Sequence, residues 1–409
     1  MLKREFNLSL FVKRLFSKYY NSVSNFFIPK KLERREFGFI LFDGELMRRH
    51  IAFRNASGFL SFIRSNVPKH IYYSSAYYEY PDADNMNDKR WLGADLIFDI
   101  DVDHIPTSCK RYHDSWKCLN CGGEGTGNVD VCPYCGSERL RKKTWVCTFC
   151  LDTARKETLK LLDFLIEDFG FDRSELEIFF SGHRGFHVHI DSDAVLEMGQ
   201  DSRREIADYV RGLGIDHSFF LRKSQKGLYR YVYDYDSPGW YKRLIRGIYS
   251  FLLKSSEDSL KRANVLTPRI KNLLEQLSVL GPDAILESEL SLREWKILME
   301  NGISEESCMI DEKVTIDTKR LIRLPDSLHG KTGLRVAKLT YDELENEDIL
   351  KKSIVFTKGV MRIYTTRIPR KVLDYDFGEI KSGVLEVPMY LGIYLLQNGG
   401  DDISLIKIL

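Results

Sequence analysis

ADLIFDIDVDH, residues 94–104, is the stretch that decides the fold. Its β-branched, aromatic and apolar residues are typical of a buried strand, and successive side chains of a strand point to opposite faces. One face carries Leu96, Phe98 and Ile100. The other face carries Asp95, Ile97, Asp99, Asp101 and Asp103. Asp99 and Asp101 are therefore neighbours on one face, with Cα atoms roughly 6.5 Å apart.

The Asp99 and Asp101 carboxylates are suited to bind divalent cations. Two carboxylates on one buried face raise each other's pKa, so the pair is costly without a counter-charge. Mg²⁺ or Mn²⁺ removes this cost, and the spacing suits two hard cations about 3.5–4 Å apart. An aspartate pair can also mark the solvated end of a strand, but the apolar context favours a strand within the core.

A second polar motif, SGHRGFHVHID, spans residues 181–191 and follows a run of apolar residues. This pattern predicts two strands joined by a tight turn, with His187 and His189 on one face. Arg184 and His187 can present N–H donors to a polyphosphate, and Gly185 lets the backbone approach closely. Two histidines at this spacing can instead ligate a metal, or simply be satisfied within a polar sheet.

The third motif, IDEKVTIDTKRLIRLPDSLHGKTG, spans residues 310–333. Its second half is rich in turn residues and in side chains that bind phosphate, namely Arg323, Ser327, His329 and Lys331. The GxxxxGK[ST] spacing of a P-loop is absent, which argues against an ATPase. Asp311 is far enough before this loop for its segment to form a strand of the sheet. In that strand it would add a third carboxylate to the metal site.

The rest of the chain mixes strand and helix patterns, which predicts an α/β fold. Strands are expected at 36–53, as a hairpin turning at an Asp-Gly pair, and at 71–80. Residues 152–169 predict a helix capped by Asp152. Residues 202–300 are mostly helical in pattern and carry no recognisable chemistry.

Composition and charge restrict the possible functions. The 409 residues are 43% hydrophobic, enough for a substantial core and for two or more domains. The net charge is only +2, so a nucleic-acid partner would need local basic surfaces. Residues 6–21 predict a basic amphipathic helix, which either packs on its own domain or contacts a template strand or another subunit. No apolar run of about 18 residues and no signal-peptide pattern is present, so we expect a cytosolic protein without a membrane partner.

Eight cysteines, mostly in CxxC pairs, indicate metal binding rather than disulfides in a reducing compartment. The segment 109–150 has few apolar residues, so a hydrophobic core alone would not stabilise it and bound metal ions are needed. A compact set with ten residues between its two pairs predicts a structural zinc ribbon, formed by Cys118, Cys121, Cys132 and Cys135. Alternatively, the first of these pairs ligates zinc together with Cys147 and Cys150. Cys308 is left over as a buried thiol.

The three motifs, in this order, resemble the signature blocks of archaeal and eukaryotic primase small subunits. REFGFILFDGELMRRHIAF near the start and CTFCLDTARKETLKLLDFL after the cysteine segment add to the similarity, which runs from about residue 35 to 340. The resemblance implies a primase catalytic core with an RNA-recognition-type mixed sheet. It also implies a zinc-binding protrusion and a helical insertion. The corresponding segments are 1–108, 151–200 and 306–409 for the core, 109–150 for the protrusion and 201–305 for the insertion.

The resemblance also implies roles for individual residues. Asp99 and Asp101 match the metal-binding pair of the family, and Asp311 matches its third catalytic aspartate. The residues matching positions that hold the triphosphate of the incoming nucleotide are Ser181, His183, Arg184, His187, Arg323 and His329. Arg49 matches a nucleotide-contacting arginine, with Arg48 as the alternative register. Asp326 stands where many archaeal relatives carry Gly, so it either faces away from the phosphates or weakens their binding.

For the metals, the resemblance implies a zinc site formed by Cys109, His113, Cys147 and Cys150. The ribbon 118–135 would be nested within it, giving two zinc ions in addition to two catalytic Mg²⁺ or Mn²⁺ ions.

The implied activity is template-directed nucleotidyl transfer that makes short primers on single-stranded DNA from nucleoside triphosphates. The expected partner is a primase large subunit, and the expected location is the nucleoid of an archaeal-type cytosol. One alternative is a repair-type primase-polymerase that extends existing ends. Another is a zinc-ribbon DNA-binding protein without catalysis, although such a protein would gain nothing from three matched carboxylates.

Overall fold

A computed structural model describes residues 7–234, 236–262, 265–378 and 382–409. The chain divides into two compact units, each described here by itself. The first unit comprises Met1–Lys156, Ser174–Arg203 and Asp311–Leu409. The second unit comprises Glu157–Arg173 and Arg204–Ile310. Among the described residues, no helix combines the length and the apolarity needed to cross a membrane.

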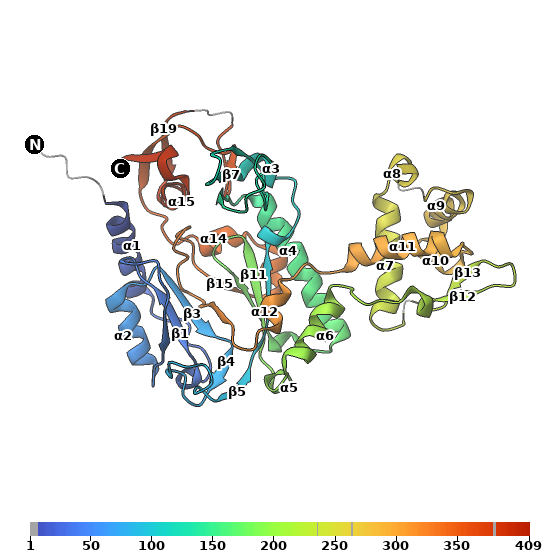
Figure 1. The fold of residues 1–409 in the computed structure, drawn as a ribbon, viewed down its shortest axis with the longest axis horizontal. Coiled ribbons are helices and arrows are strands. Elements are labelled where there is room, and N and C mark those ends of the chain that lie inside the picture. The colour runs from blue at the N-terminus through green and yellow to red at the C-terminus, as the bar shows by residue number, and fades with distance from the viewer. Residues whose placement is uncertain (1–6, 235, 263–264, 379–381) are drawn as a thin grey trace, which may run out of the picture. The chain divides into compact units, whose positions relative to one another are not determined.

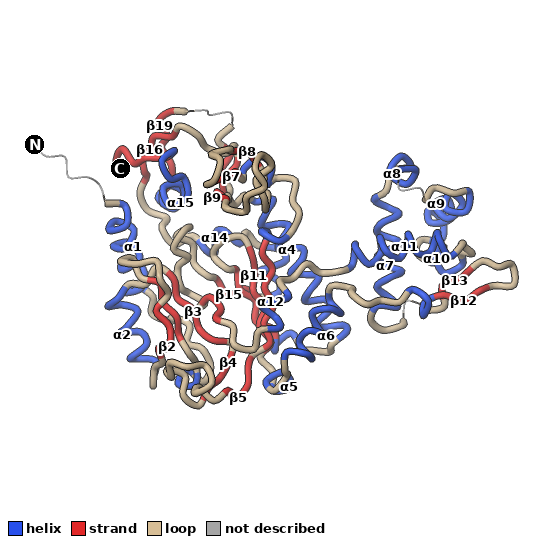
Figure 2. The backbone as a smooth tube through the Cα atoms, viewed as in Figure 1, coloured by secondary structure: helices blue, strands red, loops and turns tan. Residues whose placement is uncertain are grey.

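Two four-stranded sheets form the centre of the first unit (Figures 1 and 2). One has the order β14 (Leu321–Arg323), β3 (His70–Ser74), β1 (Phe37–Ile40) and β2 (Arg48–Ile51). The other has the order β15 (Ala337–Leu339), β10 (Leu176–Phe180), β11 (Gly185–Ile190) and β6 (Leu96–Asp101). The predicted α/β class is confirmed. Where a mixed sheet was expected, all these strand pairs are antiparallel. The tight turn between β10 and β11 requires this orientation for that pair.

Strand β6 lies where its residue pattern predicts. Leu96, Phe98 and Ile100 are fully buried, whereas Asp99 and Asp101 are only partly covered. Strand β11 pairs with β6 so that His187 is opposite Asp99. The pairing of β11 with β6 therefore joins the first two polar motifs.

Aromatic packing builds the part of the first unit around β1 and β2. The predicted hairpin is confirmed, with Phe37 opposite Ile51. Its rings pack with helix α2 (Ala56–Asn66) in a cluster of Phe37, Phe39, Phe53, Phe59 and Phe62. Helix α1 (Leu8–Ser22) buries Val12, Phe16 and Tyr20 within this unit, so it packs on its own domain. Phe6, which belonged to the predicted helix, is outside the described residues.

The helix after the cysteine segment begins earlier than predicted. Helix α4 runs from Thr148 to Asp163 and continues as a π-helical turn, Phe164–Asp168. Asp152 is therefore inside the helix, and the prediction that it caps the helix is wrong. It pairs with Arg155 at 2.6 Å and Lys156 at 2.8 Å, one turn further along. The helix starts directly after Cys147, within the cysteine cluster.

The segment 109–150 has little regular structure and a small core. Helix α3 (Lys110–His113) is followed by a three-stranded sheet of β8 (Glu124–Thr126), β7 (Ser115–Cys118) and β9 (Leu140–Lys143). Trp116, Cys118 and Cys132 form its buried cluster. The C-terminal part of the first unit has a sheet of β19 (Gly383–Pro388), β16 (Val360–Thr365) and β20 (Ile403–Ile408), covered by helix α15 (Met389–Gly399).

The remaining short elements of the first unit connect these sheets. They are β4 (Ala76–Tyr78), β5 (Trp91–Ala94), α5 (Asp193–Leu196), α12 (Glu312–Ile316), α13 (Tyr341–Asn346), α14 (Ile349–Ser353), β17 (Lys371–Val372) and β18 (Tyr375–Asp376). Helix α6 (Gln200–Val210) leads into the second unit.

The second unit is mainly helical. Its elements are β12 (Leu221–Lys223), β13 (Tyr229–Tyr231), α7 (Trp240–Lys254), α8 (Glu257–Arg262), α9 (Pro268–Leu280), α10 (Asp283–Glu287) and α11 (Leu292–Glu306). The hairpin of β12 and β13 was not predicted. Arg243, almost fully buried, pairs with Asp163 and Asp168. Cys308 is a buried thiol, as expected, and donates to the Glu157 carbonyl at 3.2 Å.

Candidate active site and metal centres

Three aspartates meet at the edge strand β6. Asp99 and Asp101 are on the strand itself, and the Asp311 N–H donates to the Asp99 carbonyl at 2.8 Å. The prediction that Asp311 lies in a strand is wrong: it is the N-cap of helix α12, where its Oδ1 accepts from the Lys313 N–H at 3.0 Å. A short helix thus brings the third carboxylate to the other two.

The electrostatics of the cluster reflect how close these carboxylates are. The pKa of Asp99 is raised to about 7, chiefly because the surrounding protein keeps most water away from its partly covered carboxylate and then because of the charges of Asp101 and Asp311. Arg320 and Arg323 oppose this shift. Such a cluster lacks enough positive charge, and hard oxygen donors of this kind suit Mg²⁺ or Mn²⁺. Among the described residues, the carboxylate oxygens do not all approach within 4.8 Å of one another as the cysteine ligands do.

His187 is the histidine that faces the carboxylates. Its Nε2 lies 3.6 Å from Asp99 Oδ1, and burial lowers its pKa to about 3, so the ring is neutral. His189, on the same face of β11, instead has its Nδ1 3.1 Å from the Tyr73 hydroxyl. The two histidines of the motif therefore have different surroundings, and only His187 contacts the acidic cluster.

The turn before β11 is held by Ser181. Its hydroxyl oxygen accepts from the N–H groups of His183 and Gly185, both at 3.3 Å. Gly182 has φ +76°, and a Cβ there would lie 3.0 Å from the Cβ of His329. Gly185 allows a close backbone approach, as expected, but to strand β6: a Cβ there would lie 2.3 Å from the Ile100 carbonyl oxygen.

Arg184 does not join the histidines. Its side chain is fully buried, forms an ion pair with Asp103, and lies 3.3 Å from Asp114 Oδ2. It also donates to the Trp145 carbonyl at 3.2 Å. The partners of the guanidinium are thus Asp103, Asp114 and the Trp145 carbonyl, and none of them is Asp99, Asp101 or Asp311. One of its partners, Asp103, is two residues after Asp101.

The third motif brings a cation and a histidine to the same site. Arg323 Nη1 lies 2.8 Å from His70 Nδ1 and donates to the Tyr72 hydroxyl at 3.2 Å. The His329 ring stacks on His183 with centroids 5.0 Å apart and contacts His70 edge to face at the same distance. His70 was missed in the sequence because it stands alone in strand β3, and only the fold brings it to Arg323.

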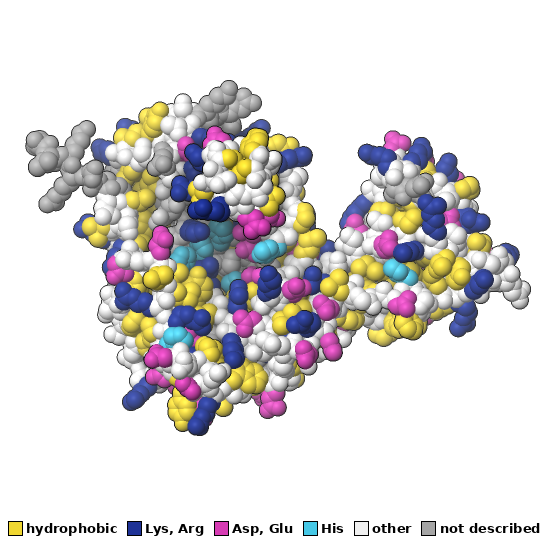
Figure 3. All heavy atoms as spheres, in the orientation of Figure 1, with side chains coloured by type: hydrophobic (Ala, Val, Ile, Leu, Met, Phe, Trp, Pro, Cys, Tyr) yellow, Lys and Arg dark blue, Asp and Glu magenta, His cyan; other side chains and the backbone are white. Residues whose placement is uncertain are grey.

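Several buried polar atoms of this site have no partner among the described residues. They are His187 Nδ1, His329 Nδ1 and Arg323 Nε. Buried polar atoms are normally hydrogen-bonded, so a group of unpaired ones indicates that a polar ligand belongs there. Figure 3 shows a hollow in the first unit, with histidine side chains at its floor and Lys and Arg side chains at its rim.

Arg49 and Asp326 lie at the margins of this arrangement. Both arginines are exposed, but Arg49 Nε donates at 3.0 Å to the fully buried Glu36, whereas Arg48 pairs with the exposed Asp43. Arg49 is therefore the member of the pair that reaches the interior. Asp326 has φ +61°, a conformation that favours glycine. Its carboxylate accepts from the Phe27 N–H at 3.0 Å and lies 3.9 Å from Arg335 Nη1.

The cysteines form two separate clusters that could hold metal. One is Cys109, His113, Cys147 and Cys150, and the other is Cys118, Cys121, Cys132 and Cys135. Sulfur pairs in them lie 3.4–3.7 Å apart, and Cys150 Sγ lies 3.3 Å from His113 Nε2. Four thiolate or imidazole ligands at such distances suit a tetrahedral ion such as Zn²⁺. The distances therefore group the ligands as the nested arrangement predicts, with the 118–135 set lying in sequence between the ligands of the other set.

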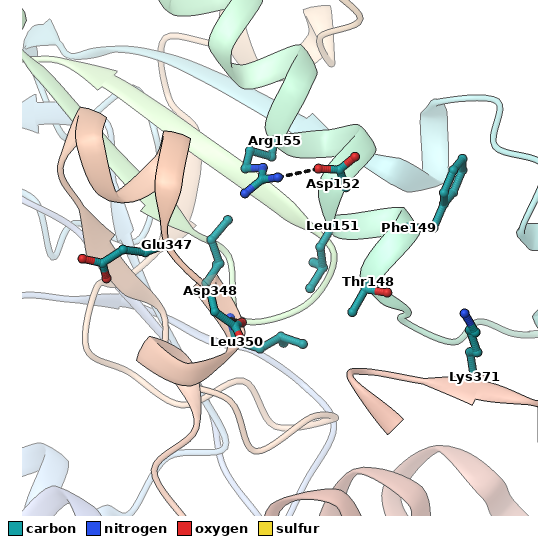
Figure 4. Close-up of a pocket in the computed structure, with 10 residues that line it drawn as sticks. Thr148, Phe149, Leu151, Asp152, Arg155, Glu347, Asp348, Leu350 and Lys371 are labelled. Carbon is teal, nitrogen blue, oxygen red and sulfur yellow. Dashed lines mark hydrogen bonds and ion pairs between the residues drawn. The ribbon is translucent and has the colours of Figure 1, made fainter. Parts of the chain in front are cut away.

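A separate cavity of about 500 Å³ lies beside helix α4. Figure 4 shows Arg155 bonded to Asp152 on its wall, with Glu347 and Lys371 from later segments across from them. None of the residues that line it belongs to the predicted site.

A cluster of carboxylates suited to divalent metal lies beside histidine and arginine side chains suited to phosphate. This combination is typical of a nucleotidyltransferase site.

Comparisons with known proteins indicate the same class of enzyme. The family described as DNA primase small subunit matches residues 129–341. The DNA primase small subunit PriS of Methanosarcina acetivorans is 33% identical, over 95% of both chains. That of Methanothrix thermoacetophila is 34% identical, over 97% of this chain and 98% of its own. That of Archaeoglobus fulgidus is 32% identical, over 95% and 97%.

The chain therefore belongs to the DNA primase small subunit family. The small subunit is the catalytic nucleotidyltransferase of DNA primase, and the expected enzyme class is confirmed.

Proposed function

We propose that this chain synthesises short primers on single-stranded DNA by template-directed nucleotidyl transfer. The 3′-hydroxyl of one nucleotide attacks the α-phosphate of an incoming nucleoside triphosphate, and pyrophosphate leaves. The observation that carries the proposal is the meeting of the three motifs at Asp99. His187 faces it across the sheet, and Asp311 is bonded to its backbone.

Asp99, Asp101 and Asp311 would hold two Mg²⁺ or Mn²⁺ ions. These ions would lower the pKa of the attacking hydroxyl and neutralise charge on the leaving pyrophosphate. The raised pKa of Asp99 supports this assignment, because a cluster that resists ionisation in isolation is stabilised by a divalent cation.

His183, His187, Arg323 and His329 would position the triphosphate. Neutral imidazoles donate a single N–H each, and Arg323 supplies the full positive charge next to them. Ser181 shapes the turn that carries His183, and Arg49 would contact the nucleotide from strand β2. Arg184 would stabilise the site without contacting the nucleotide. It pairs with Asp103, next to strand β6, and with Asp114 of the segment 109–150, and so connects the two.

The two cysteine clusters would each hold a structural zinc ion, and the segment 109–150 would form a zinc-binding protrusion. The core would then comprise 1–108, 151–200 and 306–409, with 201–305 as a helical insertion. A primase large subunit is the proposed protein partner, within the cytosol and nucleoid of an archaeal-type cell.

The test is primer synthesis on an unprimed single-stranded template with Mg²⁺ or Mn²⁺. Asp99→Ala and Asp101→Ala should each lower the rate by roughly 1000-fold, since the metals contribute several kcal/mol of transition-state stabilisation. Asp258→Ala, at an exposed position of the second unit, is the matched control and should retain full activity. Near-normal synthesis by either active-site variant would refute the assignment. Extension of primed ends without synthesis on unprimed template would instead favour a repair-type primase-polymerase.

A further inference from the structure

A second cavity, of about 490 Å³, lies within the first unit between the sheet of segment 109–150 and the C-terminal part of the chain. One wall is formed by strands β8, β7 and β9, and the other by residues 367–369 with Gly400 and Asp402. Its lining includes none of Asp99, Asp101 and Asp311, although it includes His113 of the Cys109 cluster, and no ligand has been assigned to the cavity itself.

The sheet presents one complete face to this cavity. In the register of its strands, Lys117 lies opposite Arg141 on one side and Glu124 on the other. Ser115 lies opposite Lys143 and Thr126 in the same way. Alternate residues of a strand share a face, so these six side chains form a single surface. All six line the cavity.

The cations of this surface outnumber its acids. Lys117 and Arg141 are exposed and directly opposite each other, and like charges in this position destabilise a sheet. Glu124, opposite Lys117 on the other side, is one acid against the three cations of this face, Lys117, Arg141 and Lys143. Arg367 adds a third exposed cation from the other wall, where it lies near the charge of Asp402, and none of the three exposed cations forms an ion pair among the described residues. Lys143 differs, because it is paired with Asp402 at 2.6 Å. The cavity therefore has the charge of an anion site.

The position of the cavity connects it to the catalytic strand. Asp114 lines it and is buried. The same carboxylate lies 3.3 Å from Arg184 Nη1, and Arg184 is in turn paired with Asp103, two residues after Asp101. Tyr112, at the rim, is 72% exposed, with the Arg111 guanidinium 4.9 Å from the centre of its ring, and exposed aromatic rings of this kind can stack with a base.

We propose that this cavity binds the phosphodiester backbone of a single-stranded nucleic acid, with Lys117, Arg141 and Arg367 contacting successive phosphates. The inference rests on the proposed function, since it assumes that the chain works on a DNA strand. A chain of phosphates fits the site better than one compact anion because the three cations are exposed and distributed over two walls. The cavity is thus a strand-binding subsite beside the metal site, not part of it.

The test measures binding of a fluorescently labelled single strand to the full-length protein by anisotropy at several salt concentrations. The double variant Lys117→Ala/Arg141→Ala should bind about tenfold or more weakly near 0.1 M salt. The slope of log affinity against log salt should fall by about 1.4, as expected for two lost phosphate contacts on a single strand. Arg367→Ala should lower the slope by about 0.7.

Lys142→Ala is the matched control. Lys142 is the neighbour of Arg141 on strand β9, points to the opposite face and pairs with Asp130 at 3.0 Å. Its removal should change neither the affinity nor the slope. Arg141→Glu provides a second probe: Arg141 is on the edge strand β9 and lies opposite Lys117, so the change replaces a repulsive cross-strand pair by an attractive one, and the protein should be at least as stable in thermal unfolding while it binds the strand more weakly.

Three results would overturn the proposal. The first is unchanged affinity and slope in the double variant, and the second is an equal loss of affinity in Lys142→Ala. The third is a double variant that binds the strand normally but has a raised KM for the free nucleoside triphosphate. The last result would assign the cavity to the nucleotide. Because strand binding is measured without catalysis, failure of primer synthesis in the wild-type chain would refute the proposed function and leave the binding result to be judged by itself.

Discussion

The Asp99 carboxyl group illustrates how a functional residue lowers the stability of the protein that carries it. Its pKa is about 7 in the folded chain, above the ordinary value near 3.8. A carboxyl group with a raised folded pKa stabilises the fold fully only below its unfolded pKa, and this contribution is lost as the pH rises toward 7. The metal-free fold should therefore be less stable at neutral pH, by about 1.4 kcal/mol for each tenfold weakening of the acid.

Asp99→Asn should accordingly stabilise the metal-free protein while abolishing primer synthesis. The amide carries no charge to desolvate, so the gain in melting temperature over the wild type should be larger at pH 8 than at pH 5, on the order of a few degrees. Mg²⁺ should raise the melting temperature of the wild type at pH 8 and leave the variant unchanged. Calorimetry at both pH values is the measurement, and parallel pH profiles for the two proteins would contradict it.

Residues with local signals were predictable, and residues defined by distant partners were not. Asp99, Asp101 and His187 follow from strand alternation, and the fold places them in register. His70 could not be found this way because its partner Arg323 is 253 residues away. The same holds for Arg184, whose sequence neighbours suggest a phosphate ligand but whose acidic partners come from other segments.

At the scale of elements, the pairing of β6 with β11 depends on Gly185. A Cβ at this position would lie 2.3 Å from the Ile100 carbonyl oxygen, which no rotamer can relieve. Gly185→Ala should therefore push the strands apart, lower the free energy of unfolding by about 1–3 kcal/mol, and move His187 away from Asp99. Denaturant unfolding and Mn²⁺ titration measure the two effects. Gly44→Ala is the control, because its Cβ would meet nothing within 4 Å. Equal behaviour of the two variants would count against this role.

The strands of the core were predictable as elements, whereas two helix starts were not. Period-two alternation and a tight turn identify β6, β10 and β11. Helix α4 was predicted to start at Asp152, because an aspartate before a helical pattern resembles a cap, but the chain is already helical from Thr148. Asp311 was expected in a strand, although its side chain makes the N-cap bond that starts α12. In both cases the local sequence fits two geometries, and tertiary contacts decide between them.

At the scale of the whole molecule, the cysteine segment is joined to the catalytic strand through buried charges. His113 Nδ1 lies 2.7 Å from Asp114, and Asp114 lies 3.3 Å from the Arg184 guanidinium. A carboxylate behind a metal-ligating histidine fixes the orientation of the ring. The second unit shows the limit of prediction at this scale: its helices follow from periodicity, but their pattern contains no functional motif.

The two cysteine clusters share no ligand, so they should be separable by mutation. Elemental analysis of the wild type should give two zinc ions per chain, and one ion would contradict the two-site arrangement. Cys121→Ser should lose only the ribbon zinc, leave the Asp114–Arg184 link intact, and retain nucleotidyl transfer at saturating template. Cys150→Ser removes a direct ligand and should lose the other zinc. The rate should fall by about tenfold or more, because Asp114, the outer partner of His113, would no longer hold Arg184 in place. Equal rates in the two variants would show that the buried link does not transmit the loss of zinc to the carboxylate strand.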